Sequence, residues 1–177
     1  YLPGELALME DMTGDQFIGF IARMKGMKDG AEAGRLCRLL ELDGRTPIRK
    51  MSKGTKQKVG LVCAFMAKPA LLLLDEPTSG LDPLMQNRFV ELVLEAKERG
   101  ATVLLSSHLF EEVERTCGRA AILRAGRLVA VEPVEALRRG KARTLTFTLP
   151  GGAEAAGMAA AWPGARAREA RVSVTVN

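Results

Sequence analysis

The stretch Leu71-Leu72-Leu73-Leu74-Asp75-Glu76-Pro77 decides the fold of this chain of 177 residues. Four leucines in a row, closed by two carboxylates and a proline, predict a short strand that is buried on both faces, as in a parallel sheet. Proteins of the α/β class bind ligands at the carboxyl ends of such strands. At that position Asp75 can hold a hydrated Mg²⁺, and Glu76 can polarise a water for attack on phosphorus. The alternative is a strand that simply ends in a polar turn.

Strands and helices alternate on the C-terminal side of this stretch. Pro83 opens a helix whose apolar residues repeat at helical spacing, and Gly100 ends it. Residues 102–106 then predict a second buried strand. A short helix follows, and after it come two strands, at residues 120–123 and 128–131, joined by a turn. Strands that alternate with helices predict a parallel α/β layer.

The N-terminal side reads differently, because residues 13–66 show helical patterns only. Thr13-Gly14-Asp15-Gln16 fits a capping box that opens a first helix. A second helix is expected at residues 31–42, and a third should begin between Ser52 and Thr55. We expect these helices to form a subdomain separate from the α/β layer.

The chain therefore divides into three expected parts. Residues 1–68 form a helical subdomain, residues 69–140 an α/β catalytic subdomain, and residues 141–177 an incomplete accessory region. In the accessory region, the alternating segments 144–149 and 172–176 predict two strands, separated by an alanine- and glycine-rich stretch.

Composition excludes several kinds of site. With 47% hydrophobic and 27% charged residues, the chain has the composition of a globular protein. The single histidine, His108, excludes a metal site built from several histidines. The three cysteines are too widely spaced for a disulfide framework or a thiolate zinc site, which suits a reducing compartment. They are Cys37, Cys63 and Cys117.

Charge and hydropathy give no sign of a nucleic-acid surface or a membrane span. The net charge is +5, with basic residues concentrated near residues 138–143 and 166–171. No aromatic residues interleave with them for base stacking, so a solvated face is the better interpretation. No apolar run approaches the roughly 18 residues that cross a bilayer.

Two further segments place polar groups where a phosphate can bind. Ser52-Lys53-Gly54-Thr55 begins a helix, whose exposed N–H groups and dipole favour an anion. An ordinary serine cap is the alternative there. His108 follows the second strand directly after Ser106-Ser107. A lone histidine is more often structural than catalytic.

Taken in order, these motifs resemble those of the ATP-binding cassette (ABC) family of ATPases, from Tyr1 to about Arg139. Residues 52–56 stand where the family has its signature motif. Residues 71–77 resemble its Walker B strand with the catalytic glutamate, residues 79–82 its D-loop, and His108 its switch histidine. The sequence of residues 75–83 resembles that of the transporter subunits of the family. The signature motif and residues 1–5 look most like those of bacterial efflux-type systems.

The resemblance implies a fold and a function. The fold is α/β: a partial P-loop NTPase-like cassette with a parallel sheet layer, an α-helical subdomain and a small C-terminal α+β extension. The function is that of an ATP-binding and ATP-hydrolysing subunit that powers export through a separate membrane protein. The implied cofactors are ATP and Mg²⁺. The implied partners are a transmembrane permease subunit and a second ATPase subunit in a homodimer, with no nucleic acid. The implied location is the cytoplasmic face of the cell membrane, as a peripheral protein.

The resemblance also implies residue roles. Glu76 is the catalytic base, His108 senses the γ-phosphate, and Asp75 holds Mg²⁺ through water. The signature contacts the nucleotide bound to the opposite subunit, and the D-loop joins the two sites across the dimer. The nucleotide-binding residues so implied are Ser52, Lys53, Gly54, Thr55, Ser79, Gly80 and Asp82.

The sequence departs from the family pattern in three places. No G-x-x-x-x-G-K-[ST] phosphate-binding motif is present, and the one Gly-Lys pair, Gly140-Lys141, is followed by Ala142. We therefore expect the C-terminal portion of a longer protein, truncated after the Walker A region and inactive in ATP hydrolysis by itself. Gly4-Glu5 stands where the family has a glutamine. In the signature, Lys53 and Thr55 replace a glycine and a glutamine.

Two other functions stay open at this point. One is an ABC-type ATPase that acts on nucleic acid or the ribosome. The other is a cassette that has lost hydrolysis and serves as a scaffold. Asp75, Glu76 and His108 argue against the scaffold, and the missing phosphate-binding motif argues for it.

Overall fold

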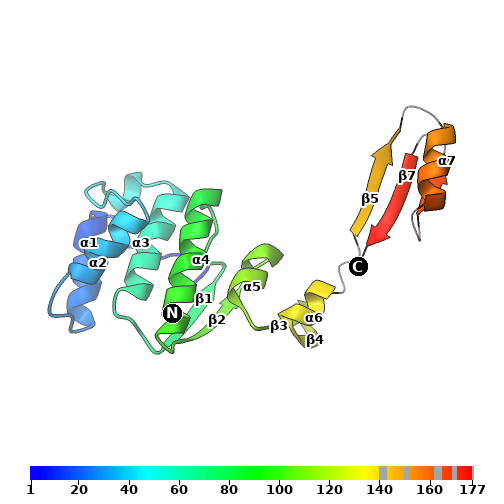
Figure 1. Cartoon of the computed structure of the whole chain (residues 1–177). Helices are drawn as coiled ribbons and strands as arrows, with labels where there is room; N and C mark the ends of the chain where they lie inside the picture. The colour runs from blue at the N-terminus through cyan, green and yellow to red at the C-terminus, as the bar shows by residue number, and fades with distance from the viewer. Residues whose placement is uncertain (140–142, 150–151, 162–164, 169–170, 177) are drawn as a thin grey trace. The chain divides into compact units, whose positions relative to one another are not determined.

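The computed structural model describes residues 1–139, 143–149, 152–161, 165–168 and 171–176 (Figure 1). The chain divides into two compact units, Tyr1–Thr116 and Cys117–Asn177. The α/β class predicted from the sequence is confirmed. The division at residues 68 and 140 remains a prediction.

Three α-helices lie in the N-terminal part of the first unit, as the helical patterns predict, and one short 3₁₀ helix that was not predicted lies among them. The capping box is present, because Thr13 Oγ1 accepts a hydrogen bond from Gln16 N at 3.3 Å and Gln16 Oε1 accepts one from Thr13 N at 2.9 Å. Ser52 caps the third helix by accepting from Thr55 N at 3.1 Å. The helices are α1 (Gly14–Met24), α2 (Ala31–Leu39), η1 (Ile48–Lys50) and α3 (Lys53–Phe65).

The second of these helices ends earlier than the predicted residue 42. The backbone of Glu41 takes a positive φ of 50°. Glu41 N donates to Arg38 O, and Leu42 N donates to Cys37 O at 2.9 Å. This pair of bonds is a Schellman ending, which closes the helix at Leu39.

The predicted parallel layer is present in the first unit. Strand β1 (Leu71–Asp75) pairs in parallel with β2 (Thr102–Ser106), and α4 (Pro83–Glu98) connects them. On the other side of β1, Leu2 forms a parallel bridge to Leu74. The short helix α5 (Phe110–Thr116) follows β2 and completes the unit.

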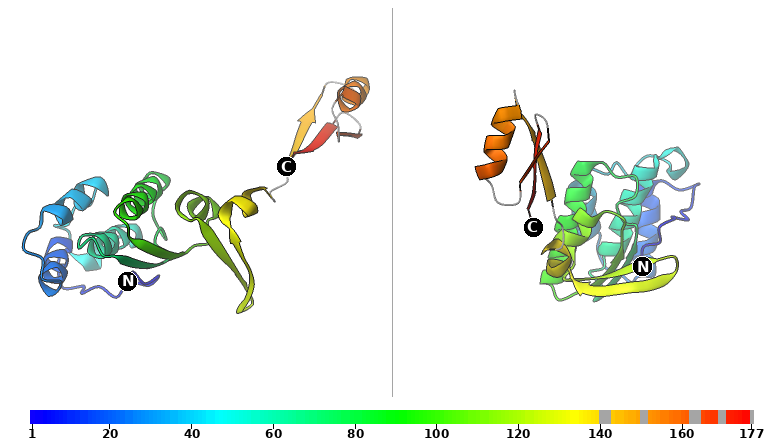
Figure 2. Two further views of the ribbon diagram at one scale, coloured as in Figure 1. Left: turned by 60° about the horizontal axis from the view of Figure 1, so that its bottom comes forward. Right: turned by 90° about the vertical axis from the view of Figure 1, so that its right-hand side faces the viewer.

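The prediction that both strands are buried on two faces was wrong. Leu72 and Leu74 are buried, whereas Leu71 is 53% exposed and Leu104 on β2 is 67% exposed. The reason is that the described helices cover one face of this sheet, as the views in Figure 2 show. Four consecutive leucines carry no alternation that would reveal a one-sided strand.

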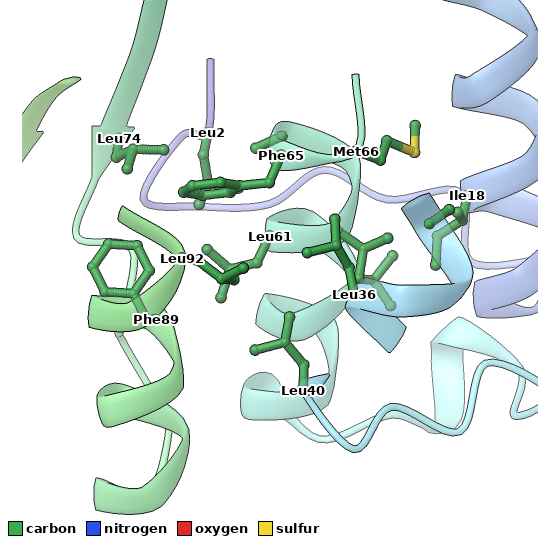
Figure 3. Close-up of a cluster of buried hydrophobic side chains, with 14 of the residues drawn as sticks. Leu2, Ile18, Leu36, Leu40, Leu61, Phe65, Met66, Leu74, Phe89 and Leu92 are labelled. Carbon is green, nitrogen blue, oxygen red and sulfur yellow. The ribbon is translucent and has the colours of Figure 1, made fainter. Parts of the chain in front are cut away.

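One hydrophobic core joins the helices to the covered face of the sheet (Figure 3). Leu36 and Leu40 from the α2 region meet Leu61 of α3, and Phe89 of α4 reaches the same cluster. The rings of Phe65 and Phe89 pack edge to face with centroids 6.4 Å apart. This core places the N-terminus of α3 and the carboxyl end of β1 in one rigid frame.

The second unit contains a hairpin and a small α+β element. Strands β3 (Arg119–Arg124) and β4 (Arg127–Pro133) pair antiparallel around the predicted turn, where Ala125 and Gly126 both have positive φ, and α6 (Val134–Arg139) follows. The two strands expected in the accessory region are confirmed as β5 (Arg143–Thr148) and β7 (Arg171–Val176).

Two further elements, which were not predicted, lie between β5 and β7 in the chain. The stretch read as only alanine- and glycine-rich forms α7 (Gly152–Ala161), which the high helix propensity of alanine favours. The short strand β6 (Arg166–Arg168) completes a three-stranded sheet in the order β5-β7-β6.

Candidate functional site

The two residues predicted to be catalytic lie in contact. Glu76 follows β1 and His108 follows β2, and the parallel register brings these carboxyl ends to one edge of the sheet. His108 Nδ1 lies 2.7 Å from Glu76 Oε2, where the carboxylate accepts a hydrogen bond from the imidazole N–H. The side chains are 73% and 35% exposed, so both can reach a ligand at this edge.

Ser106 holds the other carboxylate at the same edge. It is the register partner of Asp75, and its hydroxyl donates to Asp75 Oδ1 at 2.5 Å. The same hydroxyl oxygen accepts from Glu76 N at 3.1 Å. Sequence reasoning did not single out Ser106 as a site residue. Its place opposite Asp75 follows from the register of β1 against β2, which the sequence does not show.

The backbone of Glu76 is strained at this position. Its φ of 43° lies in the left-handed region, which residues other than glycine rarely adopt. Two hydrogen bonds from Glu76 N, to Ser106 O and Ser106 Oγ, hold this conformation. The turn directs the Glu76 side chain away from the strand β1 and toward His108, which it contacts.

The signature segment and the D-loop pack backbone against backbone. A Cβ added to Gly54 would lie 2.4 Å from Gly80 O, a distance that no side chain can occupy. Gly80 has a φ of 79°, and the Lys53 side chain lies against it. The structure therefore requires glycine at both positions, and it brings these two predicted nucleotide-binding segments together.

The remaining predicted site residues shape the ends of helices and turns. Ser52 and Thr55 share a hydroxyl–hydroxyl contact of 2.9 Å at the start of α3. Ser79 N donates to Glu76 O at 3.0 Å, which closes the turn after β1. Asp82 caps α4 by accepting from Met85 N at 3.0 Å. Each of these predicted residues thus has a local structural role in addition to the proposed one.

Gln57 is a further residue of this region that sequence reasoning missed. Its side chain, 2% exposed, lies in the second turn of α3. Nε2 donates to Pro77 O at 2.8 Å. The bond ties the signature helix to the turn that follows the two carboxylates. In the sequence Gln57 stands between Lys56 and Lys58, so nothing in the local pattern marks it as a buried residue.

The carboxylates fit Mg²⁺ only together with a nucleotide. Among the residues that the structure describes, no three His, Cys, Asp or Glu side chains gather into a metal site. Mg²⁺ commonly takes one or two carboxylates and completes its shell with phosphate oxygens and waters. Asp75 offers such a carboxylate, and its Oδ2 faces the backbone of Gly4, where a Cβ would lie 3.1 Å away.

In the described part of the chain, no helix has the length and apolarity to cross a membrane.

Comparison with known proteins gives relatives of one kind. The chain is 36% identical over 135 residues to the linearmycin resistance ATP-binding protein LnrL of Bacillus subtilis (strain 168), covering 73% of this chain and 43% of that protein. It is 38% identical over 144 residues to the ABC-type transporter ATP-binding protein EcsA of the same organism, covering 78% and 58%. The chain thus spans about half the length of these relatives.

A solved structure and a family model match as well. A structure described as the ATP-binding subunit of an ABC transporter has a TM-score of 0.69 and 36% identity, and it covers 78% of this chain and 60% of that one. Residues 39–114 match a family model described as AAA domain, putative AbiEii toxin, type IV TA system. Since the relatives found by sequence and by structure are ATP-binding proteins of ABC transporters, the chain belongs to that family.

Proposed function

We propose that this chain supplies the hydrolytic edge and the signature segment of an ATP-binding subunit that powers export through a separate membrane protein. The observation that carries the proposal is the 2.7 Å contact between Glu76 and His108 at the carboxyl edge of β1 and β2. A carboxylate beside an imidazole at this edge is suited to general base catalysis of the hydrolysis of a phosphoanhydride.

In this proposal Glu76 takes a proton from a water that attacks the γ-phosphorus of ATP. A bond forms between the water oxygen and phosphorus, the bond to the bridging oxygen breaks, and ADP leaves with that oxygen. His108 orients the Glu76 carboxylate through their hydrogen bond and contacts the γ-phosphate. Mg²⁺, when bound with the nucleotide, neutralises phosphate charge. Asp75, whose orientation Ser106 sets, would hold it through water.

The signature segment acts on a second nucleotide in the proposed homodimer. The N-terminus of α3 presents the backbone N–H groups and the positive dipole end of a helix. We propose that Ser52 and Gly54 contact the γ-phosphate held by the partner subunit, with Lys53 and Thr55 beside them. Across the same interface, the D-loop residues Ser79, Gly80 and Asp82 join the two sites.

The proposed partners follow from the relatives. LnrL is named for linearmycin resistance and EcsA for an ABC-type transporter, so we propose a transmembrane permease subunit as partner and the cytoplasmic face of the membrane as location. We further propose that the helical block from Asp11 to about Pro47 docks on that permease. The relatives favour transport over the alternative of an ATPase that acts on nucleic acid or the ribosome.

The test is Glu76→Gln in a subunit of the relatives' length that includes a phosphate-binding loop. Loss of a positioned general base slows turnover by about 10² to 10⁴-fold, while nucleotide-dependent dimers should persist because the amide keeps the shape of the side chain. Steady-state phosphate release and size-exclusion chromatography measure the two effects. Glu98→Gln, an exposed carboxylate at the end of α4, is the matched control. Turnover near the unsubstituted rate in Glu76→Gln would remove Glu76 from the role of base.

A further inference from the structure

Glu112 is a buried carboxylate that the proposed chemistry does not use. It lies in the first turn of α5 and is 6% exposed. Its Oε2 accepts from Ser107 Oγ at 2.5 Å and from Thr78 Oγ1 at 3.3 Å. Its Oε1 is also buried and has no hydrogen-bond partner among the described residues.

A buried carboxylate with one unbonded oxygen is unfavourable for the stability of the fold. Burial raises the pKa of Glu112, and the hydrogen bonds from Ser107 and Thr78 only oppose that effect. A half-satisfied buried carboxylate stabilises a fold less than an apolar side chain of the same size would. The position therefore calls for a reason beyond packing.

The two hydroxyl groups that bond to Glu112 belong to the two loops that carry the reacting pair. Thr78 is buried in the turn two residues after Glu76. Ser107 directly precedes His108, and its oxygen also accepts from Leu109 N at 3.0 Å. Through these hydrogen bonds, Ser107 restrains the chain on both sides of His108. One carboxylate oxygen, Glu112 Oε2, ties both loops together.

His108 needs such a restraint, because its side chain is largely exposed. It borders a pocket of about 330 Å³ that is also lined by Thr78, Glu112 and Arg115. The open space beside the ring permits other rotamers. The contact to Glu76 is the one hydrogen bond that the described structure shows for the imidazole.

We propose that Glu112 is a positioning residue that holds Glu76 and His108 at contact distance through Thr78 and Ser107. The role of Glu112 in catalysis rests on the proposed function. Its effect on the position of His108 beside Glu76 does not, and that effect can be measured in this chain without any nucleotide.

The first experiment uses the fact that His108 is the only histidine of the chain. In a chain labelled with ¹³C-histidine, the imidazole gives one Hε1–Cε1 resonance. Glu76→Ala defines its position when the contact is lost. We expect Glu112→Ala to move the resonance more than half of that way. Glu112→Gln, which keeps an oxygen acceptor for both hydroxyl groups, should move it much less. Glu111→Ala, on the exposed side of the same helical turn, is the matched control and should leave it in place.

An unmoved resonance in a folded Glu112→Ala chain would overturn the proposal. Should that variant fail to fold by circular dichroism, Ser107→Ala removes the same bond from the other end and is expected to shift the resonance equally. An unmoved resonance in Ser107→Ala is equally contrary to the proposal.

The second experiment is a double-mutant cycle for hydrolysis in a subunit of the relatives' length that includes a phosphate-binding loop. Glu112→Ala should lower turnover about tenfold, and it should have no further effect in the His108→Ala background, because both changes remove one function. Losses that multiply would overturn the positioning role. If that longer subunit hydrolyses no ATP while the resonance still depends on Glu112, the proposed function is refuted and the positioning role stays intact.

Discussion

The close approach of Gly54 to Gly80 leads to a sharp prediction for Gly54→Ala. The added Cβ would lie 2.4 Å from Gly80 O and 3.3 Å from Gly80 C, so the obstacle is backbone. A side chain could swing aside at little cost, whereas here α3 or the D-loop must move. Overpacking of this kind costs about 1–3 kcal/mol, which outweighs the roughly 0.5–1 kcal/mol that alanine gains over glycine in a helix. We therefore expect a net loss of stability.

Gly34→Ala in α2 is the matched control. A Cβ there meets only Arg38 Nη1, at 3.6 Å, which is ordinary contact. This variant should gain about 0.5–1 kcal/mol, because it removes conformational freedom from the unfolded chain. Urea unfolding of the chain, followed by far-ultraviolet circular dichroism, measures both changes as shifts of the midpoint with an unchanged slope. A Gly54→Ala chain as stable as the unsubstituted one would refute the argument from the backbone contact.

Two further predictions concern α3. Gln57→Leu leaves Pro77 O buried without its donor, so the free energy of unfolding should fall by about 1–3 kcal/mol; an unchanged urea midpoint would show that the bond does not matter. Burial raises the pKa of the Cys63 thiol to about 12, so in a Cys37→Ser, Cys117→Ser chain it should resist alkylation at pH 9. In the unfolded chain the thiol has a pKa near 9.0, so it ionises at a lower pH than in the folded chain. The free energy of unfolding should therefore fall as the pH rises from 9 toward 12. Alkylation at the rate of a free peptide thiol would contradict this.

Much of the local structure could be predicted from the sequence. The capping box at Thr13 and the serine cap at Ser52 are decided within a single helical turn, because side-chain oxygens satisfy N–H groups three residues away. The hairpin turn at Ala125-Gly126 and the strand before Asp75 are similarly local. The order of these motifs along the chain, from the signature to the switch histidine, is by itself enough to indicate the family.

Only the tertiary structure decided how these segments meet. The contact between Glu76 and His108 spans 32 positions and depends on the register of β1 against β2. The one-sided burial of the leucine strand depends on which face the helices cover, and a run of identical residues contains no such information. The two hydrogen bonds that Glu112 accepts, from Thr78 and Ser107, likewise depend on packing between loops far apart in the sequence. Local patterns specify the elements because they act through the backbone within a few residues, whereas the site forms only when packing brings distant side chains within hydrogen-bond distance.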